Sequence, residues 1–541
     1  IACRKMQFNA DSIHYTDVAR TIVNDHVIGT WHLTVDAERA PHTLLYWPPV
    51  YPIALALFIG MGLSAGAAAW LVSVSGYTVS AWLLSGWQRR PALGIAGVLA
   101  FIHLAFLSGV PFRAWSESVF VPLMLGSLVC MAAAIASGSG KRAAWMGLLA
   151  GALGGGAMLT RYVGAAIGVA LLGVPLMAPA RKGEESSVRR NGVIAALGGM
   201  AVVVIPWLVR NMVVNGRLFG PGRPPNERPV WQILYFTGAS IYYDLGAMLL
   251  ALIFGVVGYH LTAATKAKKA TAATTATDNG DGRADTAPVN DTAPVNGTAP
   301  VNGTGRSPAP PNGTDNDNDG RHWVFSVGLA SGALICAISQ IALILLTYLL
   351  FQIDEPPTKR YFFPAYACVL LAGLALFSRA RLPENVLSKR WGLLVAMAAP
   401  IVIGPIFAGS VATDVTPRKT QVDRWIEQNT QPNDLIIADR AWSIRFHTGR
   451  PVVEAGQVAA TPISEGEKVA KLLERVGEQV RDVYVLPQGP REEKAIVAKY
   501  PAAGLRLEKV ATVETQRREG PPGQTREQVV YRVERPGTGN G

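Results

Sequence analysis

Charge is scarce in this sequence. Lysine, arginine, aspartate and glutamate together make up 16% of its 541 residues, and 50% are hydrophobic. A typical soluble domain is about one quarter charged. The charged residues gather between long apolar stretches, which is typical of membrane proteins because a charge inside hydrocarbon costs several kcal/mol. The sequence therefore predicts a polytopic membrane protein.

Cysteine is also rare, and Cys130, Cys336 and Cys368 fall inside apolar runs, whereas Cys3 does not. This placement argues against a disulfide framework. No CxxC pair or His/Cys cluster indicates a metal site, although a requirement for a divalent cation stays open. The net charge is +12, and the basic residues cluster in short loops. The sequence shows no stretch of interleaved basic and aromatic residues of the kind found in nucleic-acid-binding proteins. We expect contact with membrane lipid and none with nucleic acid.

Ten apolar segments are long enough to span a bilayer, which takes about 20 residues. A shorter run at 52–64 predicts an interfacial helix. Basic pairs such as Arg89–Arg90 and Lys141–Arg142 lie in alternate loops, so these loops are predicted to be cytoplasmic. Residues 1–65 and the tail are then predicted to lie on the extracytoplasmic side of the cell membrane. The predicted spans are roughly 66–87, 91–110, 119–138, 143–160, 162–179, 192–210, 241–262, 323–350, 361–379 and 391–411.

Two other regions differ from the spans in composition. Residues 263–321 repeat Thr-Ala-Pro-Val-Asn from Thr286, Thr292 and Thr298, which predicts a disordered cytoplasmic linker. The tail predicts helices at 422–428, 465–476 and 491–500 and strands at 434–438, 451–453, 483–486, 505–513 and 529–533. The expected fold class is therefore mainly α, a transmembrane helical bundle with a small C-terminal extracytoplasmic α/β domain. Its regions are 1–65 (outer loop), 66–262 and 322–411 (spans), 263–321 (linker) and 412–541 (α/β domain).

Ionisable residues at the outer helix ends mark the candidate chemistry. Guanidinium groups match phosphate oxygens, a carboxylate can act as general base on a hydroxyl, and fixed cations stabilise charge that grows on a leaving phosphate. Phosphate binding is the preferred role for Arg360, because the cationic Lys359 is next to it in the sequence. The candidate residues on this predicted face are Asp11, His14, Glu117, Arg161, Arg210, Lys359, Arg360 and Tyr361.

The order of these motifs resembles the GT-C superfamily of membrane glycosyltransferases. The motifs are an acidic outer loop followed by Pro-Pro-Val-Tyr-Pro (48–52), Ser-Glu (116–117), Thr-Arg-Tyr-Val-Gly (160–164), Pro-Trp-Leu-Val-Arg-Asn (206–211) and Arg-Tyr-Phe-Phe-Pro (360–364). The branch is similar to protein O-mannosyltransferases and the aminoarabinose transferase of lipid A. The resemblance implies a polyprenyl-phosphate-linked sugar donor, transfer with inversion and a catalytic Asp11. That family has a membrane span before this aspartate, whereas this sequence begins at Ile1. Two alternatives stay open: the native N-terminus is missing from this sequence, or the N-terminus has no membrane anchor.

Each candidate has a structural alternative. Asp11 could be a helix N-cap, and Glu117 could serve the helix N-terminus instead of orienting an acceptor or metal as a second acid. Arg161 and Arg210 could snorkel to the interface, and Arg360 could pair with Asp354 or Glu355.

The remaining alternatives favour structural roles. His14 is expected to pack or hydrogen-bond, although it could approach the site. Tyr15 is expected to be interfacial, and Asp17 to pair with Arg20. Tyr361 is more typical of an aromatic belt than of a sugar platform.

Three functions remain open at this point. The first is an inverting hexosyl or pentosyl transferase that acts on a protein, lipid or glycan acceptor. The alternative is a polytopic transporter or lipid flippase, although the spans carry few midplane charges and no clear repeat. A membrane-anchored sensor with a ligand-binding tail is the third, but it leaves the outer arginine motifs without a role.

Overall fold

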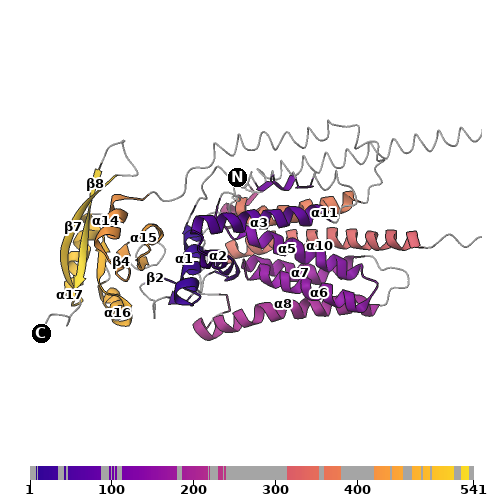
Figure 1. Ribbon diagram of the computed structural model, residues 1–541, viewed down its shortest axis with the longest axis horizontal. Coiled ribbons are helices and arrows are strands. Elements are labelled where there is room, and N and C mark those ends of the chain that lie inside the picture. Colours follow the sequence, from indigo (N-terminus) through magenta and orange to yellow (C-terminus); the bar gives the residue numbers. More distant parts are fainter. Residues whose placement is uncertain are drawn as a thin grey trace, which may run out of the picture.

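A bundle of long helices forms most of the computed structural model, and a six-stranded sheet with its helices lies at one end (Figure 1). The structure describes residues 8, 10–34, 42–43, 47–86, 97–98, 100–102, 104–105, 113–178, 186–216, 218–219, 229–235, 237–238, 314–351, 359–378, 419–438, 441–454, 466–476, 479–487, 490–516 and 525–534.

The bundle helices agree with the predicted spans wherever the structure describes them. Those predicted at 241–262 and 391–411 lie outside the described residues, and 91–110 is described only in fragments. The long helix after the linker begins within the segment 263–321 that was predicted to be disordered. The bundle comprises α3 (Ala65–Ser85), α5 (Glu117–Ile135), α6 (Gly140–Met158), η2 (Tyr162–Gly164), α7 (Ala165–Met177), α8 (Ser186–Asn215), α10 (Thr314–Leu350) and α11 (Lys359–Phe377).

Length and apolar composition suit several of these helices to a bilayer. Among the described residues, four stretches are long and apolar enough to cross one: Ala65–Ser85, Glu117–Ile135, Ser186–Val214 and Arg321–Leu350. The apolar window of α5 is 67% buried, whereas that of α8 is 28% buried. Helix α5 is therefore central, and α8 turns much of its apolar surface outward, as lipid-facing helices do.

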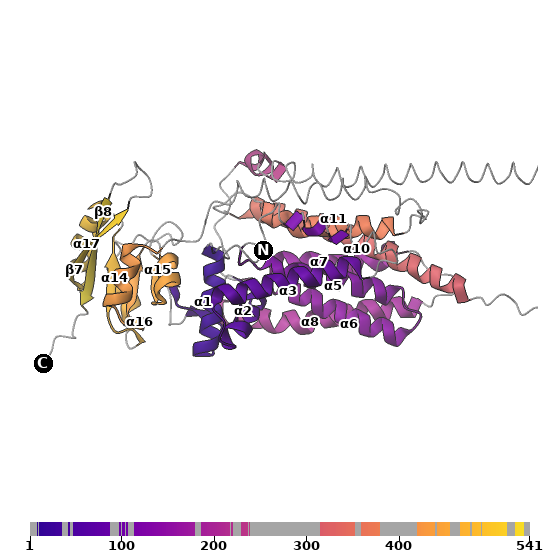
Figure 2. The ribbon, with the colours of Figure 1, turned by 45° about the horizontal axis from the view of Figure 1, so that its top comes forward.

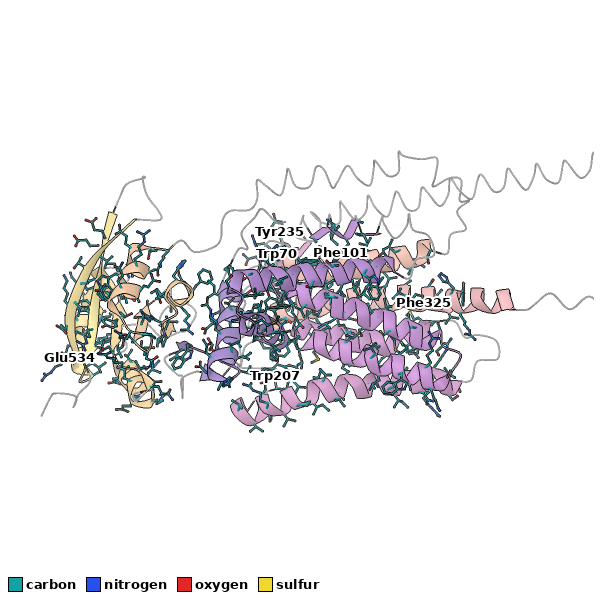
Figure 3. All side chains as sticks on the ribbon, viewed as in Figure 1. Trp70, Phe101, Trp207, Tyr235, Phe325 and Glu534 are labelled. Carbon is teal, nitrogen blue, oxygen red and sulfur yellow. The ribbon has the colours of Figure 1, made fainter. Side chains whose placement is uncertain are left out.

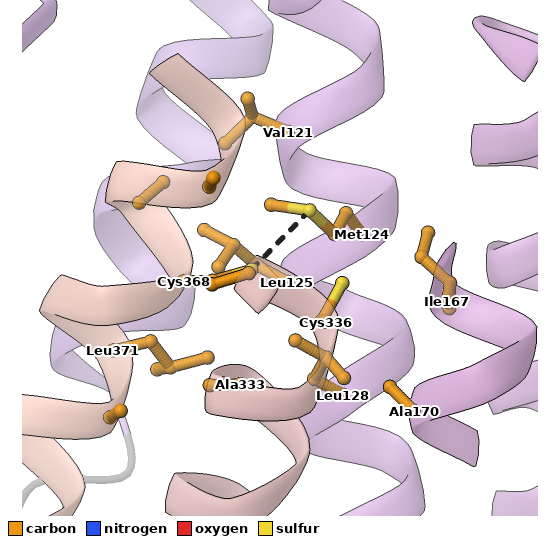
Figure 4. Close-up of a cluster of buried hydrophobic side chains, with 14 of the residues drawn as sticks. Val121, Met124, Leu125, Leu128, Ile167, Ala170, Ala333, Cys336, Cys368 and Leu371 are labelled. Carbon is orange, nitrogen blue, oxygen red and sulfur yellow. Dashed lines mark hydrogen bonds between the residues drawn. The ribbon is translucent and has the colours of Figure 1, made fainter. Parts of the chain in front are cut away.

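The centre of the bundle is a packed cluster contributed by α5, α7, α10 and α11 (Figure 4). Met124, Cys336 and Cys368 lie close together, and the Cys368 thiol contacts the Met124 sulfur at 3.5 Å. Cys130, Cys336 and Cys368 are free thiols. Their soft, apolar side chains fill the core.

Glycines let α6 and α8 approach closely. Gly147, Gly151 and Gly155 are spaced by four residues and so lie on one face of α6. A Cβ atom added to Gly151 would lie 1.8 Å from the carbonyl oxygen of Ala196 on α8. Small residues at such spacing permit backbone contact between membrane helices.

We expect Gly151→Ala to lower the free energy of unfolding in detergent by about 1–3 kcal/mol, because the methyl group forces the two backbones apart. Gly156→Ala is the matched control on the same helix, since its added Cβ would meet the Leu123 side chain at 3.5 and 3.9 Å, an ordinary van der Waals contact. Thermal unfolding of both variants measures the difference. Equal melting temperatures would contradict the close α6–α8 contact.

Two helices of the first outer loop close one end of the bundle. Helix α1 (Ala10–Asp25) lies across that end, between the bundle and the sheet, in both Figure 1 and Figure 2. Helix α2 (Val50–Gly60) corresponds to the interfacial helix predicted at 52–64. Tyr51 and Leu55 of α2 are buried with Ile13 and Tyr15 of α1. This packing holds α1 over the bundle end.

The C-terminal sheet has strand order β2-β5-β4-β6-β8-β7, in which the first four strands are parallel and the last two antiparallel. Alternate residues of β4 pack on opposite faces, Leu435 and Ile437 on one and Ile436 and Ala438 on the other. Helices cover both faces, which explains the continuous apolar runs in its central strands. The elements are α14 (Gln421–Asn429), β4 (Leu435–Ala438), α15 (Ala441–Thr448), β5 (Val452–Glu454), α16 (Gly466–Val476), β6 (Val483–Leu486), α17 (Pro490–Ala502), β7 (Arg506–Gln516) and β8 (Thr525–Glu534).

One edge strand of this sheet comes from the first outer loop. Strand β2 (His32–Thr34) pairs in parallel with β5, with Leu33 opposite Val453. Leu33 is fully buried in the sheet's core. A short ribbon of β1 (Gly29–Thr30) and β3 (His42–Thr43) flanks it. The outer loop and the tail, predicted as separate regions, therefore share one sheet.

Candidate functional site

A buried ion pair lies where α1 meets the bundle. Glu117 is the first residue of α5 and is 1% exposed, whereas Arg161, in the turn after α6, is 18% exposed. The Arg161 guanidinium donates a hydrogen bond to the Glu117 carboxylate. A buried carboxylate requires such a partner because its desolvation is costly. Arg161 therefore points inward to Glu117, and the snorkelling alternative does not describe it.

An aromatic ring from a third element completes this side of the site. The Arg161 guanidinium carbon lies 5.4 Å from the centre of the Tyr361 ring. Tyr361 is in the first turn of α11 and makes an edge contact with Tyr348 of α10, with ring centres 6.2 Å apart. The side chains of Lys359 and Arg360, two residues and one residue before Tyr361, lie outside the described part of the chain.

Tyr15 joins α1 to the ion pair. Burial raises the pKa of the Tyr15 phenol, the Asp11 carboxylate raises it further, and the Arg161 guanidinium opposes both. A hydrogen bond with Ser116 lowers the pKa of the phenol, and the nearby Glu117 carboxylate raises it. Asp11 lies one turn before Tyr15, on the same face of α1.

Asp11 is half-buried within the first turn of α1, one residue past its start, and so does not occupy the N-cap position. The structure thus brings Tyr15 into electrostatic range of Asp11, Glu117 and Arg161. The helix dipole favours a carboxylate at this position.

His14 and Arg210 lie beside this group in aromatic contacts. His14 stacks on Trp47 with ring centres 4.6 Å apart, as its expected packing role requires. Arg210 lies over the Trp207 ring at 4.4 Å and donates to the Asn211 side-chain oxygen at 3.0 Å. Trp207 lies at the bundle end nearer α1, and Phe325 toward the other end (Figure 3).

The Trp207 and Asn211 side chains both donate to the Tyr162 hydroxyl, at 3.2 and 3.4 Å. Because Tyr162 directly follows Arg161, this aromatic group adjoins the ion pair along the chain. Arg210 itself makes its described contacts within the aromatic group.

Sequence reasoning missed two features of this region. Tyr15 was expected to be interfacial, but it is buried beside the site, and its four-residue spacing from Asp11 is the signal that could have located it. Asp17 was expected to pair with Arg20. Its carboxylate acts electrostatically on Arg20, but it also accepts a hydrogen bond from Arg445 of α15 at 2.6 Å. No local sequence signal links Asp17 to so distant a residue.

The arrangement offers acid–base and anion-binding chemistry. A half-buried carboxylate at Asp11 can accept a proton, and the Arg161 guanidinium can bind a phosphate oxygen. Within the described ranges, no three His, Cys, Asp or Glu residues form a group that could hold a metal ion.

The chain matches no protein-family model and no curated protein sequence. It is similar in structure to ArnT from Cupriavidus metallidurans bound to undecaprenyl phosphate, at 13% identity and a TM-score of 0.44 over 98% of this chain and 94% of that one. It is also similar to the Archaeoglobus fulgidus oligosaccharyltransferase AglB. In complex with an inhibitory peptide and a dolichol-phosphate, AglB matches at 12% identity, a TM-score of 0.43 and coverage of 92% and 68%. The structure of AglB in complex with Zn and sulfate matches at 12% identity and a TM-score of 0.43, over 89% of this chain and 64% of that one. The two proteins are described in complex with a lipid phosphate, undecaprenyl phosphate for ArnT and a dolichol-phosphate for AglB.

Proposed function

We propose that this protein is an inverting glycosyltransferase that moves a sugar from a polyprenyl-phosphate donor to an acceptor hydroxyl at the extracytoplasmic membrane face. One observation carries the proposal. Tyr15, one turn after the Asp11 carboxylate on α1, lies within electrostatic range of both Asp11 and the buried Glu117–Arg161 pair at the end of an apolar helix bundle. A lipid-borne phosphate needs a cation at the membrane edge, and the hydroxyl that attacks needs a base beside it.

In the proposed reaction Asp11 takes the proton from the acceptor hydroxyl, and the oxygen attacks the anomeric carbon. The bond between that carbon and the phosphate oxygen breaks, and polyprenyl phosphate leaves with the bonding electrons. Attack opposite the leaving group inverts the anomeric centre. Arg161 stabilises the charge that grows on the phosphate, and Lys359 and Arg360 are proposed to assist. Glu117 orients Arg161.

Charge distribution supports the proposed orientation. The N-termini of α5 and α11 and the C-termini of α6 and α8 lie at the bundle end next to α1 (Figure 1). The opposite end carries Lys141 and Arg142 at the start of α6 and Arg189 and Arg190 near the start of α8. Basic loops favour the cytoplasmic side, so the proposed site faces outward.

Purified protein in lipid nanodiscs, supplied with radiolabelled polyprenyl-phosphate sugars, tests the reaction. We expect release of free polyprenyl phosphate and transfer of label to an acceptor, and a panel of hexose and pentose donors identifies the sugar. Transfer measured with and without a chelator tests for a divalent cation. Lipid or substrate flux in liposomes without transfer would favour the transporter or flippase alternative.

Accessibility labelling tests the geometry separately. Single cysteines at positions 11 and 360 should react with a membrane-impermeant reagent from the same side of the membrane. Labelling from opposite sides would contradict a shared reaction centre.

A further inference from the structure

A second ion pair lies on another face of α1, away from the candidate site. Asp17 is 3% exposed and accepts three hydrogen bonds. Its Oδ2 accepts from the Thr30 hydroxyl at 2.5 Å and from the Trp31 backbone N–H at 2.9 Å. Its Oδ1 accepts from the Arg445 Nε at 2.6 Å. The carboxylate therefore has partners from both the outer loop and the C-terminal domain.

Arg445 is held equally firmly on its own side. It lies in α15, is buried, and also donates to the Gly449 carbonyl. Gly449 has a φ of +68°, the left-handed conformation that ends a helix and favours glycine. The turn after α15 thus holds the Arg445 guanidinium in place, independently of its contact with Asp17.

Aromatic packing and strand pairing accompany this ion pair. The rings of Phe8 and Phe446 lie with their centres 5.1 Å apart, and β2 extends the sheet beside β5. Burial and the neighbouring Arg445 guanidinium lower the pKa of Arg20, while Asp17 opposes the shift. The outer loop and the C-terminal domain therefore meet through a specific, buried contact.

A contact of this kind tolerates little movement. Separating the two parts would leave a carboxylate and a guanidinium without partners in a partly apolar setting, which is costly. Asp17 lies six residues after Asp11 and two after Tyr15 on the same continuous helix. Because an α-helix transmits position rigidly over such a length, the place of Asp17 constrains that of Asp11.

We infer that Asp17 and Arg445 are positioning residues: their buried pair docks the C-terminal α/β domain onto α1 and thereby holds Asp11 and Tyr15 toward the Glu117–Arg161 pair. The docking follows from the contacts alone, and its effect on transfer rests on the proposed function. The C-terminal domain is then a structural part of the reaction centre.

Docking is measured first, without reference to activity. Cysteines replace Phe8 and Phe446, Cys3 and Cys130 are replaced by serine, and the core thiols Cys336 and Cys368 stay because they are buried. A short bifunctional thiol reagent then reports how often the two positions meet. We expect Asp17→Asn and Arg445→Gln each to slow cross-linking about tenfold, the coupling typical of residues in direct contact.

Lys419→Gln is the matched control, because it breaks the exposed Lys419–Glu427 pair of the same domain and should leave the cross-linking rate unchanged. Unchanged cross-linking in Asp17→Asn and Arg445→Gln would overturn the docking role.

Transfer is measured second, in the same variants. Asp17→Asn should lower kcat with little change in the KM for the donor lipid, because the Asp17 carboxylate is engaged by Thr30, Trp31 and Arg445 and not by the Glu117–Arg161 pair. Cross-linking positions 8 and 446 in the Asp17→Asn background should restore kcat. Failure of the closed cross-link to restore it would overturn the positioning role. If the unmodified protein transfers no sugar, the proposed function fails, and the cross-linking rates still decide docking.

Discussion

Replacing Asp11 with asparagine is expected to lower the rate of sugar transfer by about 10²–10⁴-fold, the usual contribution of a general base. Asparagine has nearly the same shape but cannot take the proton from the acceptor hydroxyl. Donor binding should change little, because the proposed phosphate contacts come from arginines. Release of labelled polyprenyl phosphate over a range of acceptor concentrations separates kcat from KM.

Asp25→Asn is the matched control, because Asp25 is an exposed carboxylate at the other end of α1 whose described contact is a hydrogen bond from the Trp31 indole at 2.9 Å. It should retain nearly full transfer. Full activity in Asp11→Asn would remove Asp11 from the mechanism and require another base.

Replacing Arg161 with methionine is expected to lower the free energy of unfolding by about 3 kcal/mol, because it strands the Glu117 carboxylate in the interior. The double variant Glu117→Gln/Arg161→Met should recover much of that loss, since no buried charge is left unpaired. Sugar transfer should stay low in both, because the proposed phosphate ligand is absent. Thermal unfolding in detergent and transfer assays measure the two effects independently.

Arg210→Met provides the comparison for stability. It removes a guanidinium that lies over Trp207 and leaves Glu117 paired. It should therefore lower the free energy of unfolding by less than Arg161→Met does. A double variant no more stable than Arg161→Met would mean that the two side chains are not coupled.

Helices and strands were largely predictable from sequence. The predicted span 119–138 is α5 (Glu117–Ile135), and the predicted strand 483–486 is β6 (Val483–Leu486). Both are continuous apolar runs whose length separates a membrane helix from a buried strand. Helix α15 (Ala441–Thr448) was missed because it is short and mixes polar with apolar residues.

Strand β2 was missed for a different reason. Its three residues are too few to show a period, and it is a strand only because β5 provides hydrogen-bonding partners far along the chain. Similarly, the Glu117–Arg161 pair joins positions 44 residues apart, and the Asp17–Arg445 pair joins positions 428 apart. Asp17 has Arg20 one turn away, so local spacing pointed to Arg20 and could not point to the distant Arg445.

The sequence by itself determined the membrane class, the positions of the apolar helices and the residue types available for chemistry, because hydropathy and helix or strand periods are local properties. Only the tertiary structure decided that Arg161 turns inward to Glu117, that Tyr15 lies beside them and that the outer loop shares a sheet with the tail. Those outcomes depend on which buried charges and unpaired strand edges find partners. Such partners come from chain segments that only folding brings together.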